Sequence, residues 1–312
     1  MVVQHNLTAM NSNRMLGLTS AAQAKSTEKL SSGYKINRAA DDAAGLSISE
    51  KMRRQIRGLT QASANAQDGI SCVQTAEGAL NEVHDMLQRM NELAVKGETG
   101  TLTTVDRSYI QAEVKQLMDE IDRVADTTTF NEQNLLDGSF TGKGMQVGAE
   151  AGQHIDISIT SMSMSNLVTK ATVANINYDH DGDEDTAKIA MDATMAENVR
   201  AKFQDYDGIQ TSGDTIATSK DFASLNAFVK TALQTVSKQR SDLGAVQNRL
   251  EHTINNLDNV VENTTAAESA IRDTDMATEM VKYSNNNILQ QAGQAMLAQA
   301  NQANQGVLSL LG

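Results

Sequence analysis

Residues 48–94 decide the fold: ISEKMRRQIRGLTQASANAQDGISCVQTAEGALNEVHDMLQRMNELA. Apolar residues recur in this stretch at every third or fourth position, with a mean spacing of about 3.5 residues, which is the period of a coiled coil. A single helix over these residues would be roughly 70 Å long. Proline is absent from all 312 residues, so no proline interrupts the predicted helix, where it would cost about 3 kcal/mol. The apolar seam consists of Ile48, Met52, Ile56, Leu59, Ala62, Ala66, Ile70, Val73, Ala76, Leu80, Val83, Leu87, Met90 and Ala94.

Two further stretches carry the same spacing. One runs from Val229 to Ile271, and the other from Ile110 to Val124, after the turn-like KGETGTLTT at 96–104. Helices with matching seams pack against one another, so we expect the chain to leave by one long helix and to return by another. The sequence therefore predicts a mainly α fold, a long antiparallel coiled-coil-like helical bundle.

The middle of the chain changes character. Residues 145–148 and 155–159 alternate apolar with polar side chains around glycine-rich turns, which predicts a small β-hairpin region. Residues 161–222 are polar and lack a long periodicity, apart from a short helix expected near 186–204. We expect this outward, variable segment to sit off the bundle.

Both ends of the chain carry narrow apolar stripes at helical spacing, broken by asparagine, glutamine and arginine. Such helices are marginal alone, and they can pair with each other or with copies on other molecules. A polymer requires the second option. The predicted polymerisation residues are Leu7, Met10, Leu18, Leu289, Ala292, Met296, Ala300, Val307 and Leu310.

Charge and composition exclude several classes of function. The formal net charge is −13, and an acidic surface repels nucleic-acid phosphates and anionic lipid, so we expect neither partner. No apolar stretch approaches the ~18 residues of a membrane span. The N-terminal MVVQHNLTAM has no basic region, apolar stretch or small-residue cleavage site, so we expect no ordinary secretory signal. The single cysteine, Cys72, forms no intramolecular disulfide and is predicted to be a small buried hydrophobe rather than a reactive thiol.

No constellation of residues indicates an enzyme, a metal site or a cofactor. A zinc protease needs two histidines four residues apart on a helix, and none of the five histidines makes that pair. The acidic run YDHDGDEDT has neither the glycine nor the glutamate of a calcium-binding EF-hand loop in register, so a solvated loop is favoured over weak, irregular calcium binding. Its aspartates are Asp179, Asp181, Asp183 and Asp185.

Both ends of the sequence resemble bacterial flagellin. The stretch EKLSSGYKINRAADDAAGLSISEKMRRQIRGL (28–59) is similar to the family's N-terminal signature, and ILQQAGQAMLAQANQANQGVLSLLG (288–312) to its C-terminal block. TAEGALNEVHDMLQRMNELAV (75–95) and RSDLGAVQNRLEHTINNL (240–257) continue the likeness. This near-continuous match favours a filament subunit over a hook–filament junction protein or a signalling coiled coil.

The resemblance implies a domain organisation and a set of partners. Residues 1–43 and 272–312 would form an inner domain, 44–140 and 222–271 a rod domain, and 141–221 an outward segment. Such subunits leave the cell unfolded through the flagellar type III export apparatus and polymerise head-to-tail into the extracellular filament that drives motility. The implied partners are other copies of the chain, a flagellar export chaperone, and the filament cap and hook-junction proteins.

The resemblance also implies recognition by host Toll-like receptor 5 through the rod domain. The family's receptor-contact arginine, leucine and glutamate match Arg89, Leu93 and Glu113. Met90 and Asn91 depart from the pattern, because many agonist flagellins carry valine and arginine there. The same residues could instead serve only to pack neighbouring subunits.

Overall fold

The computed structural model describes residues 6–173, 199–204 and 216–311, with side chains at 169–173, 201, 204 and 303–311 left aside. The chain forms two compact units. Met1–Gly58 with Asn259–Gly312 is called the terminal unit, and Leu59–Asp258 the central unit. Helices α2 (Ala43–Glu98) and α6 (Ser219–Arg272) each contribute one part to either unit. The predicted class, mainly α and built on long helices, is confirmed.

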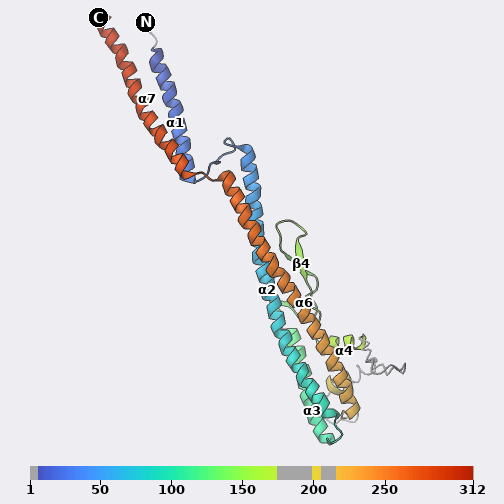
Figure 1. Ribbon diagram of the computed structural model, residues 1–312. Helices are drawn as coiled ribbons and strands as arrows, with labels where there is room; N and C mark the ends of the chain where they lie inside the picture. The colour runs from blue at the N-terminus through green and yellow to red at the C-terminus, as the bar shows by residue number, and fades with distance from the viewer. Residues whose placement is uncertain (1–5, 174–198, 205–215, 312) are drawn as a thin grey trace. The chain divides into compact units, whose positions relative to one another are not determined.

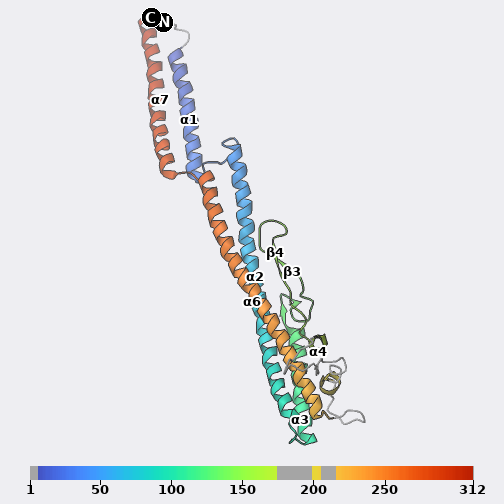
Figure 2. The same cartoon turned by 45° about the vertical axis from the view of Figure 1, so that its right-hand side comes forward.

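In the terminal unit, α1 (Leu7–Ser32) and α7 (Met276–Leu311) lie side by side in both views (Figures 1 and 2). α1 begins where the Asn6 side chain accepts a hydrogen bond from the Ala9 amide. It ends at Gly33, whose φ of 76° lets its N–H reach the Lys29 carbonyl and close the last turn. Both predicted terminal helices are therefore present.

Tyr34 joins the segment after α1 to the segment between α6 and α7. It forms an antiparallel bridge with Asp273, and the neighbouring Lys35 N–H donates to the Arg272 carbonyl at 2.7 Å. The Arg272 guanidinium lies 4.7 Å from the centre of the Tyr34 ring, and its Nη1 donates to Glu50 Oε1 at 2.9 Å. Cation–π and charge-assisted contacts thus connect the segment after α1 with α2 and with the end of α6.

The core of the central unit lies between α2, α3 (Thr104–Thr127) and α6. α3 begins with a capping box, in which Thr103 and Asp106 exchange hydrogen bonds between side chain and backbone. Cys72 is 1% exposed, and burial raises the pKa of its thiol, which confirms the prediction of a small buried hydrophobe. Seam residues that are less than 3% exposed include Ala62, Ala66, Val73, Ala76, Leu80, Val83, Leu87, Met90 and Ala94.

The seam of α2 is not buried over its whole predicted length. Ile48 is 47% exposed, and Met52 and Ile56 are only half-buried. These three residues belong to the terminal unit, whereas the later residues of the seam are covered by α3 and α6 in the central unit. The single helix predicted over 48–94 is therefore present, and its seam is less buried at the N-terminal end than in the central unit.

Four short strands follow α3. β1 (Thr129–Phe130) pairs with β2 (Gln133–Asn134) through a tight turn. β3 (Lys143–Gln146) pairs antiparallel with β4 (His154–Ile157), with Met145 opposite Ile155. The predicted hairpin is therefore present, with its strands ending slightly earlier than expected. The Ile155 side chain of this hairpin is buried with Ala66 of α2 and Leu250 of α6. The hairpin therefore packs against both long helices within the central unit.

The described part of the segment 161–222 does not sit off the bundle, and that prediction is wrong. Met162 and Leu167 of the stretch around α4 (Met164–Val173) are at most 1% exposed and belong to the main core. Phe203 of the short π-helix η1 (Arg200–Gln204) packs edge-on against Phe222 of α6, with ring centres 5.2 Å apart. Of the helix expected near 186–204, residues 186–198 lie outside the described residues, as do the four aspartates of the acidic run.

Buried polar groups explain how this segment docks. The side chain of Gln111, 0% exposed, donates to the Lys202 carbonyl and accepts from the Ala217 N–H. Asp122 accepts from the Met164 amide at 2.6 Å and so caps α4 from α3. Each bond satisfies backbone that burial would otherwise leave unpaired.

Candidate functional surfaces

The contact between α1 and α7 is made mostly of small and polar residues. The side chain of Leu16 lies over Gly293, where an added Cβ would be 3.3 Å from Leu16 Cδ1, so the helices approach closely there. Half-buried residues recur at a helical spacing on each helix and mark the facing sides. They are Ala9, Ser12, Leu16, Thr19 and Gln23 on α1, and Tyr283, Asn286, Gln290, Gly293, Leu297 and Ala300 on α7.

Two hydrogen bonds fix the register of this pair near its ends. Asn6 Nδ2 donates to the Ala300 carbonyl at 3.1 Å. At the other end the buried Ser26 hydroxyl donates to Glu279 Oε1 at 2.7 Å, and Lys282 Nζ donates to Glu279 Oε2 at 3.2 Å. The Ser26 hydrogen bond, followed by Lys282, lowers the pKa of Glu279, so the carboxyl is held in its charged form.

The apolar residues of these helices lie mainly outside that contact. Leu7, Met10 and Leu18 of α1 are 62–68% exposed, and Leu289 and Met296 of α7 are 57% and 63% exposed. Ala292 is also exposed, whereas Ala300 is half-buried against α1. Val307 and Leu310 fall among the residues whose side chains are not described. The structure thus brings α1 and α7 together without using most of the predicted polymerisation residues.

Sequence reasoning missed part of this surface. Met276, Met280, Val281 and Ile288 are also exposed, near the start of α7. The spacings of four from Met276 to Met280 and seven from Val281 to Ile288 are the signal that could have found them. The terminal stripes are hereafter the exposed apolar residues Leu7, Met10, Met15 and Leu18 on α1 and Met276, Met280, Val281, Ile288, Leu289 and Met296 on α7.

The predicted receptor-contact residues divide into two kinds of environment. Arg89 of α2 donates through Nε and Nη2 to Glu113 Oε1 of α3 at 3.0 and 2.9 Å, and through Nη1 to Glu92 at 2.9 Å. Both carboxylates raise the pKa of Arg89, Glu113 the more strongly. Arg89 and Glu113 are about half-exposed, whereas Leu93 is 2% exposed and belongs to the core. A partner can therefore reach the ion pair but not the Leu93 side chain.

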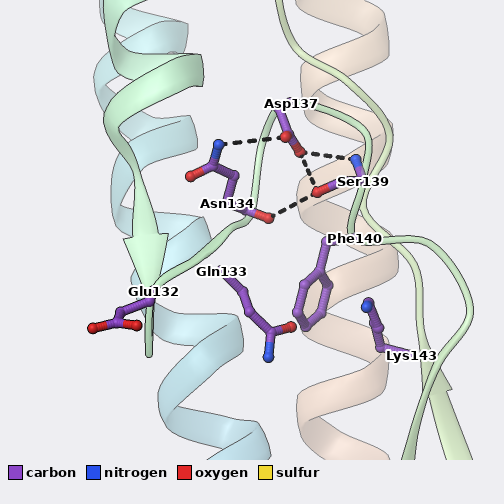
Figure 3. Close-up of a pocket in the computed structure, with 7 residues that line it drawn as sticks. All are labelled: Glu132, Gln133, Asn134, Asp137, Ser139, Phe140 and Lys143. Carbon is purple, nitrogen blue, oxygen red and sulfur yellow. Dashed lines mark hydrogen bonds between the residues drawn. The ribbon is translucent and has the colours of Figure 1, made fainter.

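One shallow pocket of about 340 Å³ adjoins the strands of the central unit (Figure 3). Of the two acidic residues that line it, Glu132 and Asp137, the second accepts hydrogen bonds from the Ser139 hydroxyl (2.7 Å) and amide (2.8 Å) and from Asn134 Nδ2 (3.4 Å). The Ser139 bonds lower the pKa of Asp137, so this group closes a turn and is poorly placed to act as a base.

Within the described residues, no three histidine, cysteine or acidic side chains converge as metal ligands. None of the helices described has the length and hydropathy of a membrane span.

Two family models match the chain. The bacterial flagellin N-terminal helical region matches residues 3–141, and the bacterial flagellin C-terminal helical region matches residues 227–311. The chain belongs to the bacterial flagellin family. The flagellin of Halalkalibacterium halodurans is 48% identical, and that of Bacillus subtilis is 49% identical, each over the full length of both chains.

Family membership gives this flagellin its class of function. It is a structural subunit of the flagellar filament and not an enzyme. A structure described as a putative flagellar hook-associated protein from Vibrio parahaemolyticus aligns with a TM-score of 0.53, covering 75% of this chain and all of that one, at 14% identity. That likeness shows a shared fold alone, whereas the full-length relatives place the chain among the flagellins.

Proposed function

We propose that this flagellin polymerises head-to-tail through the terminal stripes, each of which packs against a neighbouring copy. The supporting observation is that α1 and α7 pair mostly through small and polar residues, together with Leu16 and Leu297, while the side chains of the terminal stripes are each about half exposed or more. Fully burying a leucine or methionine contributes about 1.5–3 kcal/mol. The stripes therefore hold a large share of the apolar surface that association can remove from water.

The presence of two different stripes allows an open polymer. When α1 of one copy packs on α7 of the next and the reciprocal contact is not made, the interface is heterologous rather than self-complementary. Repeated contacts of this heterologous kind generate a helical filament when the rotation does not close a ring. We infer in addition that α1 and α7 become fully ordered only on assembly, because their mutual seam buries little apolar surface to offset ordering entropy.

Seeded growth tests the proposal. Filament fragments would seed the intact monomer, a chain lacking 288–312, and the point variant Leu289→Lys, with growth followed by negative-stain electron microscopy. Gln294→Lys is the matched control, because it places the same charge at an exposed polar position of the same helix. We expect growth from the intact chain and from Gln294→Lys alone. Growth of the truncated chain at the normal rate would overturn the proposal.

We also propose the route by which the subunit reaches the filament. The chain would leave the cell unfolded through the flagellar type III apparatus, with an export chaperone holding the C-terminal helix and the cap inserting subunits next to the hook-junction proteins. The exposed apolar residues of α7 support this, because they need cover before assembly. The test compares secreted flagellin in strains with and without the export apparatus; unchanged secretion would contradict it. The division into 1–43 with 272–312, 44–140 with 222–271, and 141–221 stays part of the proposal.

A second proposed function is binding to Toll-like receptor 5. The exposed Arg89–Glu113 pair supports it, because it presents two of the three predicted contacts on adjacent helices. Leu93 would act only by holding α2 in the core. We expect Arg89→Asp to lower the response of receptor-expressing reporter cells, and Arg123→Asp, at an exposed ion pair further along α3, to leave it unchanged. An unaltered response to Arg89→Asp would count against this surface.

A further inference from the structure

The methionines within the described residues differ widely in exposure. Among the described side chains, those that are roughly half or more exposed all lie on the terminal stripes, and their exposed fractions range from 49% to 64%. They are Met10, Met15, Met276, Met280 and Met296. In the central unit, Met90, Met118, Met162 and Met164 are at most 1% exposed, and Met86 and Met145 are half-buried.

This division has a chemical consequence, because a thioether reacts with oxidants in proportion to its access. A hydroperoxide transfers one oxygen to the methionine sulfur: its O–O bond breaks, an S=O bond forms, the sulfur loses two electrons and the peroxide is reduced to water or an alcohol. The product is a methionine sulfoxide, a polar and chiral group in place of an apolar one. Sulfoxide reductases reverse the reaction.

We propose that the five stripe methionines are a set of oxidation sites through which hydroperoxides block the assembly of free subunits. The proposal rests on the proposed function of the terminal stripes. Half of the stripe positions are methionine, so a single oxidant converts half of the apolar side chains of that surface into polar ones. The central core keeps its thioethers, since its methionines are covered.

The same geometry makes the sensitivity depend on assembly. A free subunit exposes the five sulfurs, whereas a subunit in the filament covers those that pack against its neighbours. Oxidation therefore removes subunits before they add to the growing end and leaves existing filaments largely intact. Methionine suits such an interface because its unbranched side chain adapts to its neighbour, but that flexibility comes with a reactive sulfur.

The experiment oxidises full-length monomer with hydrogen peroxide, maps sulfoxides by peptide mass spectrometry, and measures seeded growth. Three samples are compared: wild type, a variant with leucine at all five positions, and oxidised wild type treated with methionine sulfoxide reductases A and B. Leucine keeps the apolar surface and cannot be oxidised. We expect oxidised wild type to grow at least about tenfold more slowly, the leucine variant to grow equally before and after peroxide, and the reductases to restore growth. We also expect sulfoxide to form more slowly at the five positions in filaments than in monomers.

Three results would overturn the proposal: normal growth of wild type with sulfoxide at all five positions, loss of growth by the peroxide-treated leucine variant, or no recovery with the reductases. If the leucine variant does not grow before peroxide treatment, the proposal is judged by whether the reductases restore the growth of oxidised wild type. Leu289→Lys, assayed alongside, separates this inference from the proposed function. If Leu289→Lys blocks growth but oxidation does not, only the role of the methionines is refuted. If the Leu289→Lys variant also grows normally, the role of the terminal stripes in assembly is refuted.

Discussion

Gly97, near the end of α2, is expected to tolerate no side chain. A Cβ built there would lie 2.6 Å from both Cγ and Cε1 of Phe222, about 1 Å inside ordinary contact. The Phe222 ring is 0% exposed and packs against Phe203, so it has no free space into which to move. We expect Gly97→Ala to cost about 1–3 kcal/mol through overpacking, offset by up to about 1 kcal/mol of helix propensity.

Gly78 is the matched control on the same helix. It is exposed, and an added Cβ would meet nothing within 4 Å, so Gly78→Ala should stabilise by about 1 kcal/mol through helix propensity alone. Urea unfolding of the full-length monomer, followed by far-UV circular dichroism, measures both changes as midpoint shifts at equal slope. Gly97→Ala should lower the urea midpoint, and Gly78→Ala should raise it. A Gly97→Ala chain that gains as much stability as the Gly78→Ala chain would refute the packing argument.

Ser26→Ala should weaken the α1–α7 pair by about 1–2 kcal/mol, because it leaves the buried Glu279 carboxylate with Lys282 alone; unchanged amide exchange along α1 would contradict this. The lowered pKa of Glu279 means that its contribution is present above its ordinary value of 4.5 and is lost as the pH falls through the lower folded value. The protection factors of the α1 amides, which are corrected for the intrinsic pH dependence of exchange, should therefore fall in acid, and Glu279→Gln should remove most of that fall. Glu132, at φ 62° in the β1–β2 turn, should accept glycine with a gain of up to about 1 kcal/mol in thermal unfolding, and a clear loss would argue against backbone strain. Leu93→Ala should cost about 2–5 kcal/mol by leaving a core cavity, so its effect on the receptor response should vanish when activity is compared per folded molecule.

The helices could be predicted because each long seam repeats one period over many turns. The seam residues from Leu59 to Ala94 are buried, except for the half-buried Ile70, and α3 buries Ile110, Val114 and Ile121 of its predicted seam. Over such lengths a spacing of about 3.5 residues has few alternative explanations. The hairpin could be predicted for a similar reason, from an alternation of period two between glycines.

The docking of residues 161–222 could not be predicted in the same way. Met162, Met164 and Leu167 are too few to establish a period, and the ring that packs against Phe203 belongs to Phe222 of another helix. From the sequence alone, Gln111 would be taken for a polar surface residue. Only the fold brings it to its two backbone partners, the Lys202 carbonyl and the Ala217 N–H. When a segment docks through a few long-range contacts, its own sequence does not predict the docking, because the residues that it contacts lie elsewhere in the chain.

The surface residues show a further limit of periodicity. A stripe at helical spacing says that one face of a helix is apolar, but it does not say whether the partner is in the same chain. In the central unit the seam faces α3 and α6 of the same molecule and is buried. On α1 and α7 most of the large apolar side chains are exposed, while Ser12, Thr19 and Asn286 lie in the helix contact. A terminal pair that buried its own leucines would be a more stable monomer with less apolar surface to offer a neighbour. The polar contact between the terminal helices therefore keeps the stripes available for assembly.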